Sequence, residues 1–164
     1  MQKNKLSKAA VLKHNQKSYS LAEILGAENK LTEVEQKIIN SRIVGECFED
    51  IQQSRTAIDQ IMLRGAAICG CTIPATEFFA KVIAEEIEVF IKEFGYGELT
   101  LNEIFLAMRL NAKGGLKHPS GLEIEQVPFS GNHINVDYLS KVLYNYLAIR
   151  NHLDRKLQNN IDGY

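Results

Sequence analysis

A long helix at the centre of the fold is predicted by the stretch PATEFFAKVIAEEIEVFIKEF, residues 74–94. Pro74 suits the first turn of a helix, because its missing N–H would be unpaired there in any case. Gly95 and Gly97 follow the stretch and end the helix. A stripe of apolar residues at helical spacing runs along it, comprising Phe78, Phe79, Val82, Ile83, Ile87, Phe90 and Ile91. Because this stripe is wide, we expect the helix to be central to the core.

Two capping boxes precede this stretch. Thr32-Glu-Val-Glu35 has the form in which a hydroxyl and a carboxylate each satisfy a free backbone N–H, and it predicts the start of a long helix. The apolar stripe of that helix comprises Val34, Ile38, Val44, Phe48, Ile51, Ile58 and Met62. We expect it to bend near Gly45 and to end near Gly65 or Gly70. The other box, Ser20-Leu-Ala-Glu23, predicts a short helix over residues 21–26.

A third capping box, Thr100-Leu-Asn-Glu103, follows the central stretch and predicts a helix through about Ala112, with its inward residues at Ile104, Phe105 and Met108. Residues 113–135 are rich in Gly and Pro, and Leu122 and Ile124 alternate there with two glutamates, which favours a short strand or hairpin near 114–129. Asn135 is placed to cap a last helix from Val136 to about Leu157. Its inward face comprises Leu139, Leu143, Tyr146, Leu153 and Leu157. The sequence therefore predicts a mainly α, compact helical domain of about five to six helices.

Length and composition are those of one ordinary globular domain. The chain has 164 residues, of which 45% are hydrophobic and 24% are charged. No apolar run approaches the length needed to cross a bilayer, and the first twenty residues lack the apolar stretch of a secretory signal. The three cysteines, Cys47, Cys69 and Cys71, are few and odd in number, which favours reduced thiols. We therefore expect a cytoplasmic protein without a membrane partner.

The net charge of −1 is unevenly distributed along the chain. Residues 1–31 carry a net charge of +4, residues 32–95 a net charge of −5, and the remainder is neutral. We interpret residues 1–18 as a basic N-terminal arm and residues 19–164 as a single helical domain. The acidic middle disfavours nucleic-acid binding, whereas the basic arm is able to contact phosphates or an acidic partner; a solubilising tail explains the arm about equally well.

Motifs for metal binding and catalysis are weak in this sequence. Cys69 and Cys71, together with His118 and His133, could in principle bind zinc. However, one residue separates the two cysteines, whereas zinc-binding cysteine pairs usually have at least two residues between them. Small, half-buried residues at a helix end therefore explain the cysteine pair better. Lys113-Gly114-Gly115 follows a helix instead of preceding one and is not a phosphate loop. The sequence also lacks a GxSxG nucleophile motif. We therefore predict a protein that is not an enzyme and that binds no cofactor and no metal.

The best candidates for binding a partner are bases and aromatic residues near the two ends of the chain. The last helix combines tyrosines with bases, a mixture that suits protein interfaces and stacking on single-stranded nucleic acid; a core helix with a hydrated outer face explains it nearly as well. The candidate binding residues are Lys3, Lys5, Lys8, Lys13, Lys17, Arg109, Tyr146, Arg150, Arg155 and Lys156.

Two segments carry a resemblance to a known group of proteins. They are YGELTLNEIFLAMRLNAKGG, residues 96–115, and GNHINVDYLSKVLYNYLAIRN, residues 131–151. Together they resemble small uncharacterised proteins of bacteriophages and related mobile elements, in which an LTxxEIxxAxR helix precedes a variable Gly-containing stretch and a tyrosine-bearing helix. The resemblance implies a role as a replication accessory, engaging the host replicative helicase or fork DNA. It points to Thr100, Glu103, Arg109, Asn111 and Tyr146 as motif positions.

From these patterns we expect a non-enzymatic accessory protein that acts through protein–protein contacts in phage DNA replication. Two alternatives stay open. One is a direct nucleic-acid-binding protein that uses the basic arm and the last helix. The other is a structural component of a virion or other assembly, in which the N-terminal arm clasps a neighbouring subunit and copies of the chain form a homo-oligomer.

Overall fold

The computed structural model describes residues 11–14, 17–20, 31–114, 124–129 and 131–162. Five α-helices occur in this described part: α3 (Glu33–Ile43), α4 (Ser54–Cys69), α5 (Glu77–Glu93), α6 (Leu101–Ala112) and α7 (Val136–Asp162). A 3-10 turn, η2 (Phe48–Asp50), lies between α3 and α4. Strands β1 (Val11–His14) and β2 (Lys17–Ser20) pair antiparallel, with Val11 opposite Ser20. The predicted mainly α fold is confirmed at this level.

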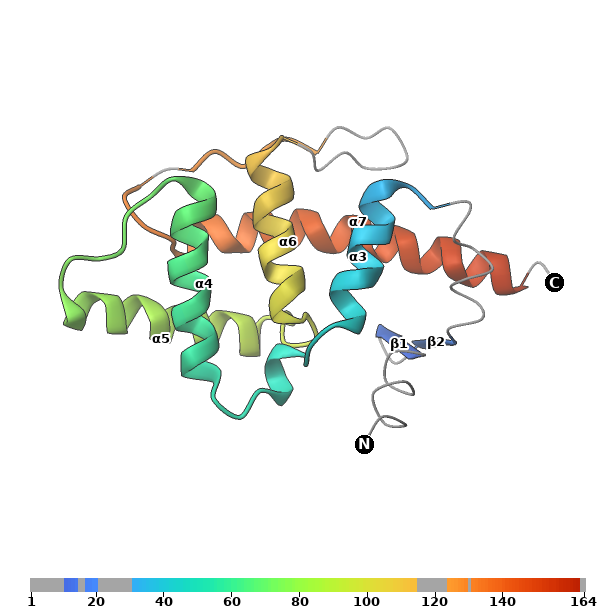
Figure 1. The fold of residues 1–164 in the computed structure, drawn as a ribbon, viewed down its shortest axis with the longest axis horizontal. Coiled ribbons are helices and arrows are strands. Elements are labelled where there is room, and N and C mark those ends of the chain that lie inside the picture. Colours follow the sequence, from blue (N-terminus) through green and yellow to red (C-terminus); the bar gives the residue numbers. More distant parts are fainter. Residues whose placement is uncertain (1–10, 15–16, 21–30, 115–123, 130, 163–164) are drawn as a thin grey trace.

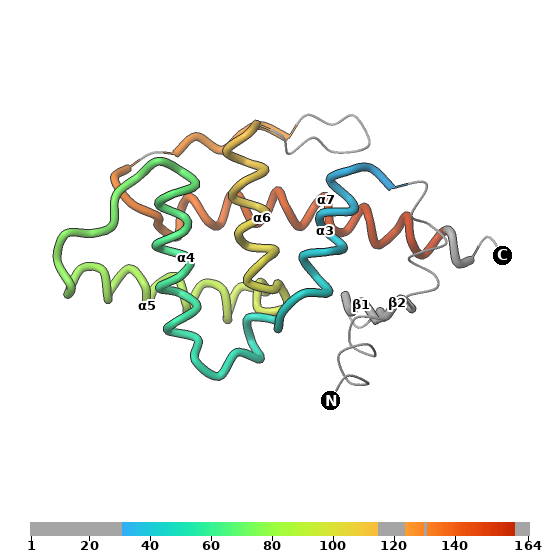
Figure 2. The backbone as a smooth tube through the Cα atoms, viewed as in Figure 1, coloured from blue at the N-terminus to red at the C-terminus, as the bar shows by residue number. Residues whose placement is uncertain are grey.

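The helices form two crossing layers (Figure 1). α4, α6 and α3 lie side by side in one layer, and α5 and α7 cross behind them. Figure 2 shows that the chain enters this arrangement through α3 and leaves it along α7, which runs behind α6 and α3. α6 therefore contacts α3, α4 and α7, and the apolar core surrounds it.

α6 begins where the capping box predicts. The Thr100 hydroxyl accepts a hydrogen bond from the Glu103 N–H at 3.1 Å, and the Glu103 carboxylate accepts one from the Thr100 N–H at 3.0 Å. Thr32 and Glu35 form the same reciprocal pair at the start of α3. Asn135 caps α7 by accepting a hydrogen bond from the Tyr138 N–H at 2.9 Å. The three predicted helix starts are thus confirmed by their side-chain caps.

The single long helix predicted from Thr32 to Gly65 or Gly70 is wrong, because the chain breaks between Ile43 and Ser54. Gly45 has a φ of +104°, which is outside the helical region and favours glycine. The backbone N–H groups of Phe48 and Glu49 then donate to the carbonyls of Leu99 and Gly97 at 2.8 and 3.0 Å. These long-range hydrogen bonds replace the intrahelical ones. The segment 44–53 therefore anchors the start of α6 instead of continuing α3.

The strand or hairpin predicted near 114–129 is not seen. Residues 124–129 have no strand pairing, and residues 115–123 lie outside the described residues, as does the short helix predicted over 21–26. The amide side chain of Asn111 replaces a partner strand, since it donates to the Val127 carbonyl at 3.0 Å and accepts from the Val127 N–H at 2.9 Å. The Gln126 amide donates to the Asn111 carbonyl at the end of α6.

α5 lies at the edge of the core and not at its centre. Ile87 and Ile91 are fully buried, as expected, but Phe78, Phe79 and Val82 are exposed. The central position belongs to α6, in which every residue from Glu103 to Asn111 is buried except Arg109. The width of the α5 stripe therefore reflects a second apolar face that points to solvent.

The proposed division of the chain at residue 18 stays a prediction, because most of residues 1–30 lie outside the described residues. None of the described helices is both long enough and apolar enough to span a membrane.

Candidate functional site

A buried network of charges connects α6 to α7. The carboxylate of Glu103 is fully buried and accepts hydrogen bonds from the Arg150 Nε at 2.8 Å and the Tyr146 hydroxyl at 3.0 Å. Burial, reinforced by the nearby negative charge of Glu103, raises the pKa of Tyr146 well above its ordinary value. Tyr146 is thus a neutral hydrogen-bond donor. Within this network Glu103 serves as both a helix cap and the ionic partner of Arg150.

Two further ion pairs join α3 to α7. Arg42 and Asp154 are both buried and meet at 2.7 Å. Lys156 donates to the buried Glu35 carboxylate at 2.8 Å. Burial by itself raises the pKa of Glu35, but the hydrogen bonds from Lys156 and from the Thr32 N–H more than offset this, so the pKa lies below its ordinary value. The charged residues of α7 therefore hold the helices together.

Tyr146 and Arg150 must accordingly be removed from the predicted binding surface. Tyr146 is 0% exposed and Arg150 is 2% exposed, so neither side chain reaches a partner while the domain is folded. Sequence reasoning placed them with surface bases because a helix that carries tyrosines and arginines looks the same whether those residues are paired inside or exposed outside.

The other predicted binding residues occupy different places. Lys3, Lys5 and Lys8 lie outside the described residues, whereas Lys13 and Lys17 belong to β1 and β2. Arg155 is exposed on α7 and contacts the backbone carbonyl of Asn151, and Lys156 is engaged with Glu35. Of the other candidates within the described residues, none lines the pocket in which Arg109 of α6 lies.

Arg109 lies in a groove between α3 and α6. The groove has a volume of about 500 Å³. Leu106 and Leu110, both largely buried, form its apolar floor. The residues that line it, here called the Arg109 groove, are Lys37, Asn40, Ser41, Val44, Asn102, Leu106, Arg109, Leu110 and Lys113. This lining contains three cations and no acid, so the groove suits a ligand that is apolar on one side and negatively charged.

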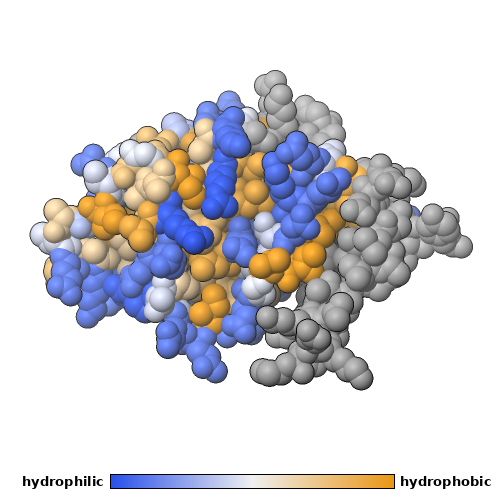
Figure 3. Space-filling model, in the orientation of Figure 1, coloured by the Kyte–Doolittle hydropathy of each residue, from blue (hydrophilic) through white to orange (hydrophobic). Residues whose placement is uncertain are grey.

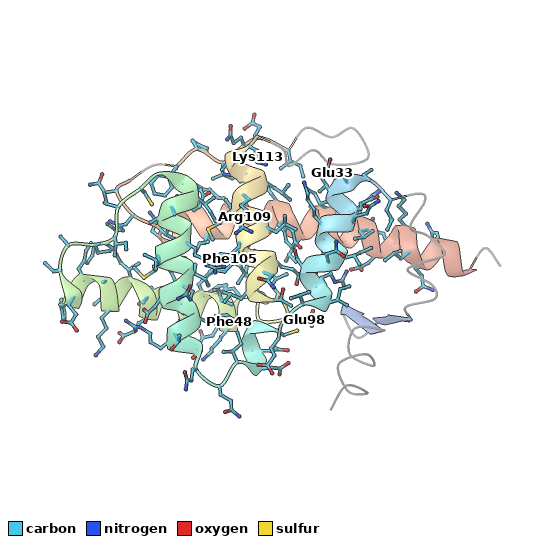
Figure 4. The ribbon with its side chains drawn as sticks, viewed as in Figure 1. Glu33, Phe48, Glu98, Phe105, Arg109 and Lys113 are labelled. Atoms are coloured by element: carbon cyan, nitrogen blue, oxygen red, sulfur yellow. The ribbon has the colours of Figure 1, made fainter. Side chains whose placement is uncertain are left out.

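The cations lie toward one end of the groove. Figure 4 shows Arg109 in the C-terminal half of α6 and Lys113 directly after its last residue, with Glu33 at the start of α3 near the same end. Lys37 pairs with Glu33 at 2.5 Å, and the pKa of Glu33 is lowered mainly by this hydrogen bond and charge, with a smaller effect of Lys113. The side chains of Arg109 and Lys113 make no hydrogen bond or ion pair with any described residue. Their charges are therefore available to a ligand.

A further base lies beside α6. Arg64 of α4 lies over the ring of Phe105, with its guanidinium carbon 5.0 Å from the ring centroid. Figure 3 shows hydrophilic side chains on either side of apolar atoms over α6 and α3. An apolar strip bordered by polar side chains is a common arrangement at protein interfaces, where arginine is enriched.

Cys69 and Cys71 form part of a different cluster. The Cys69 thiol donates to the Tyr138 hydroxyl at 3.2 Å, and Asn111 also donates to that hydroxyl, at 3.3 Å. Burial raises the pKa of both thiols, so they are protonated and poorly nucleophilic. Among the described residues no three His, Cys, Asp or Glu side chains gather as metal ligands, and His118 lies outside them.

Comparisons with protein-family models, with curated proteins and with solved structures each give no match to this chain. The case for a function therefore depends on the groove itself. Sequence reasoning identified Arg109 but missed Lys37, Lys113 and the two asparagines of the lining. These residues come from helices that are about sixty residues apart in sequence, and only the packing of α3 against α6 unites them.

Proposed function

We propose that this protein is a non-enzymatic accessory protein that binds an acidic, amphipathic segment of another protein in the Arg109 groove. One observation carries the proposal. Of the five positions that form the resemblance motif, four have partners inside the fold, whereas the side chain of Arg109 has none among the described residues. An arginine that is exposed beside an apolar floor, with a second free cation in Lys113, is suited to a carboxylate-bearing helix.

The resemblance of residues 96–115 and 131–151 to phage proteins supports DNA replication as the setting. In that setting the partner would be a replication protein, such as the host replicative helicase or another protein at the fork. The groove adds a chemical requirement for this partner, namely an exposed segment with apolar anchors and carboxylates.

Direct binding of nucleic acid is the second candidate function. It is supported by the three cations of the groove and by the six lysines of residues 1–31. The burial of Tyr146 and Arg150 weakens it, because stacking on single strands needs accessible aromatic rings and, of the three tyrosines of α7, Tyr144 alone is exposed. The apolar floor of the groove would also make no favourable contact with a charged phosphate backbone.

An affinity purification from the cells that produce the protein tests the proposal. The tagged wild-type chain is compared with Arg109→Glu/Lys113→Glu and with Lys141→Glu/Arg155→Glu, which changes the net charge equally on α7. We expect a protein partner that survives nuclease treatment, is retained by the α7 variant and is lost from the groove variant. A partner that all three chains retain would refute the groove as its site, and material lost on nuclease treatment would favour nucleic acid.

A further inference from the structure

The outer face of α5 carries the other conspicuous surface of the molecule. Phe78, Val82 and Val89 are 79%, 37% and 44% exposed, and their spacing of four and seven residues places them on one side of the helix. Exposed glutamates flank them at Glu85, Glu86 and Glu93. These six residues are here called the α5 ridge. Single exposed apolar residues are ordinary, but three on one helix face with a polar border indicate an interaction site.

The ridge is negatively charged. Lys81 lies 4.0 Å from Glu85, and Lys92 pairs with Glu88 at 2.6 Å. Glu86 and Glu93 form no ion pair with any described residue. The ridge therefore presents two uncompensated carboxylates on the same helix as its apolar anchors, which is the chemistry that the Arg109 groove requires of its ligand.

The apolar part of the ridge also matches the groove in length, and the two surfaces match in polarity. The apolar side chains of the ridge run from Phe78 to Val89, which are eleven residues apart, as are Asn102 and Lys113 at the two ends of the α6 wall. The apolar part of the ridge and the α6 wall therefore each span about 16 Å, and Glu93 extends the ridge by about one further turn. Phe78 and Val82 lie in the N-terminal half of the ridge, and Glu86 and Glu93 lie in its C-terminal half together with Val89. In the groove Val44 and Asn102 lie at one end, and Lys37 and Lys113 at the other. With α5 parallel to α6, Phe78 and Val82 meet the uncharged end, and Glu86 and Glu93 meet the cations.

We propose that the α5 ridge of one copy of this protein docks in the Arg109 groove of a second copy. α5 and the groove belong to different layers of the fold, so one copy is unable to fill its own groove with its own ridge (Figure 1). The contact is head-to-tail and joins unlike surfaces, which allows further copies to add at both ends. This inference rests on the proposed function, since it names an occupant of the same groove. Self-association then competes with the acidic partner for Arg109.

A charge exchange between two full-length variants tests the contact. Arg109→Glu/Lys113→Glu makes the groove acidic, and Glu86→Lys/Glu93→Lys makes the ridge basic. In each variant alone, like charges face each other across the contact, and we expect self-association at least about tenfold weaker than in the wild type. In an equimolar mixture the acidic groove meets the basic ridge, and the unaltered groove meets the unaltered ridge. The mixture should therefore associate at the protein concentrations at which the wild type does.

Sedimentation velocity over a concentration series measures this association in purified protein, and circular dichroism verifies that each variant is folded. Lys141→Glu/Arg155→Glu and Glu46→Lys/Glu98→Lys are charge-matched controls and should associate as the wild type does. The inference is overturned if the wild type stays monomeric up to its solubility limit, if either variant alone associates like the wild type, or if the mixture stays monomeric. Failure of the proposed function is separately visible, as the absence of a groove-dependent partner in the affinity purification.

Discussion

The two charged residues of α6, Glu103 and Arg109, lie on the same short helix and differ in almost every physical respect. Glu103 is fully buried and has three hydrogen-bond partners, from Thr100, Tyr146 and Arg150. Arg109 is exposed at the groove and has no partner among the described residues. The buried side of α6 thus fixes the packing of helices, whereas the exposed side leaves a charge free for binding. A residue's type therefore says little about its role until its partners are known.

Removal of the Glu103 carboxylate should have the largest effect on stability. Glu103→Ala removes the carboxylate that pairs with the buried guanidinium of Arg150 and should lower the free energy of unfolding by about 3–5 kcal/mol. Arg109→Ala should change it by less than about 0.5 kcal/mol, as for an exposed side chain outside the core. Urea unfolding of both variants measures the difference. Equal losses would contradict the distinction between the two sides of α6.

The close packing of α4 against Ile134 and against Met108 of α6 sharpens the comparison. A Cβ added at Gly65 would lie 2.9 Å from the Ile134 Cγ1 and 3.3 Å from the Met108 Sδ, both within the core. Gly65→Ala should therefore cost about 1–3 kcal/mol of stability through overpacking. At Gly97 the added Cβ would meet the side chain of the exposed Glu49, which is able to move aside. We expect Gly97→Ala to cost less than Gly65→Ala in the same unfolding measurement, and the reverse order would argue against a rigid α4–α6 contact.

The two capping boxes offer a smaller contrast. Thr100 is buried and its hydroxyl also donates to the Ser41 carbonyl at 2.7 Å, whereas Thr32 caps α3 in an exposed position. Thr100→Ala should cost about 2 kcal/mol and Thr32→Ala about 1 kcal/mol, at the upper end and the middle of the range for lost caps. Thermal unfolding of the two variants tests the order. If Thr32→Ala proves the more damaging, the α6 cap is not the stronger anchor.

The smallest effect concerns two glutamates of α3, whose pKa values are both lowered. Glu35 is buried against Lys156, and Glu33 is fully exposed beside Lys37. Because the folded pKa of Glu35 is depressed, its contribution to stability is present above the unfolded pKa of about 4.3 and is lost as the pH falls through the folded value. High salt should return the pKa of Glu33 toward its ordinary value and leave that of Glu35 depressed.

Carboxylate titration by NMR at low and high salt measures both pKa values. In Lys156→Met the acid-induced loss of stability should shrink, whereas Lys37→Met should leave it unchanged. A salt response of the same size at both glutamates would mean that Glu35 is not buried as described.

The elements that the sequence predicts well are those specified by neighbouring residues. The caps at Thr32, Thr100 and Asn135 involve partners three residues away and were predicted with their helices. The break at Gly45 depends on hydrogen bonds from Phe48 to Leu99, some fifty residues distant, which no local pattern reveals. A helical period likewise does not distinguish the buried side of α5 from its exposed ridge.

The same limit applies to the candidate site. Arg109 was predicted as a binding residue, but Arg150 was predicted on equal grounds and proves to be buried. The two arginines differ only in whether a carboxylate from another helix is within reach. Lys37 and Lys113 had no signal in the sequence, because their proximity to Arg109 arises from the packing of α3 on α6.

The most direct test of the central claim is a photo-crosslinking amino acid placed at Asn40 in the full-length protein. Asn40 is exposed and lines the Arg109 groove without contributing its charge. Irradiation of cells that produce this variant, followed by mass spectrometry, should give a covalent adduct with another protein. The adduct should disappear when Arg109→Glu is added. The same photo-crosslinking amino acid at Gln52, an exposed control position, should give no adduct. If no adduct forms at position 40, or if the adduct persists with Arg109→Glu, the groove is not a docking site.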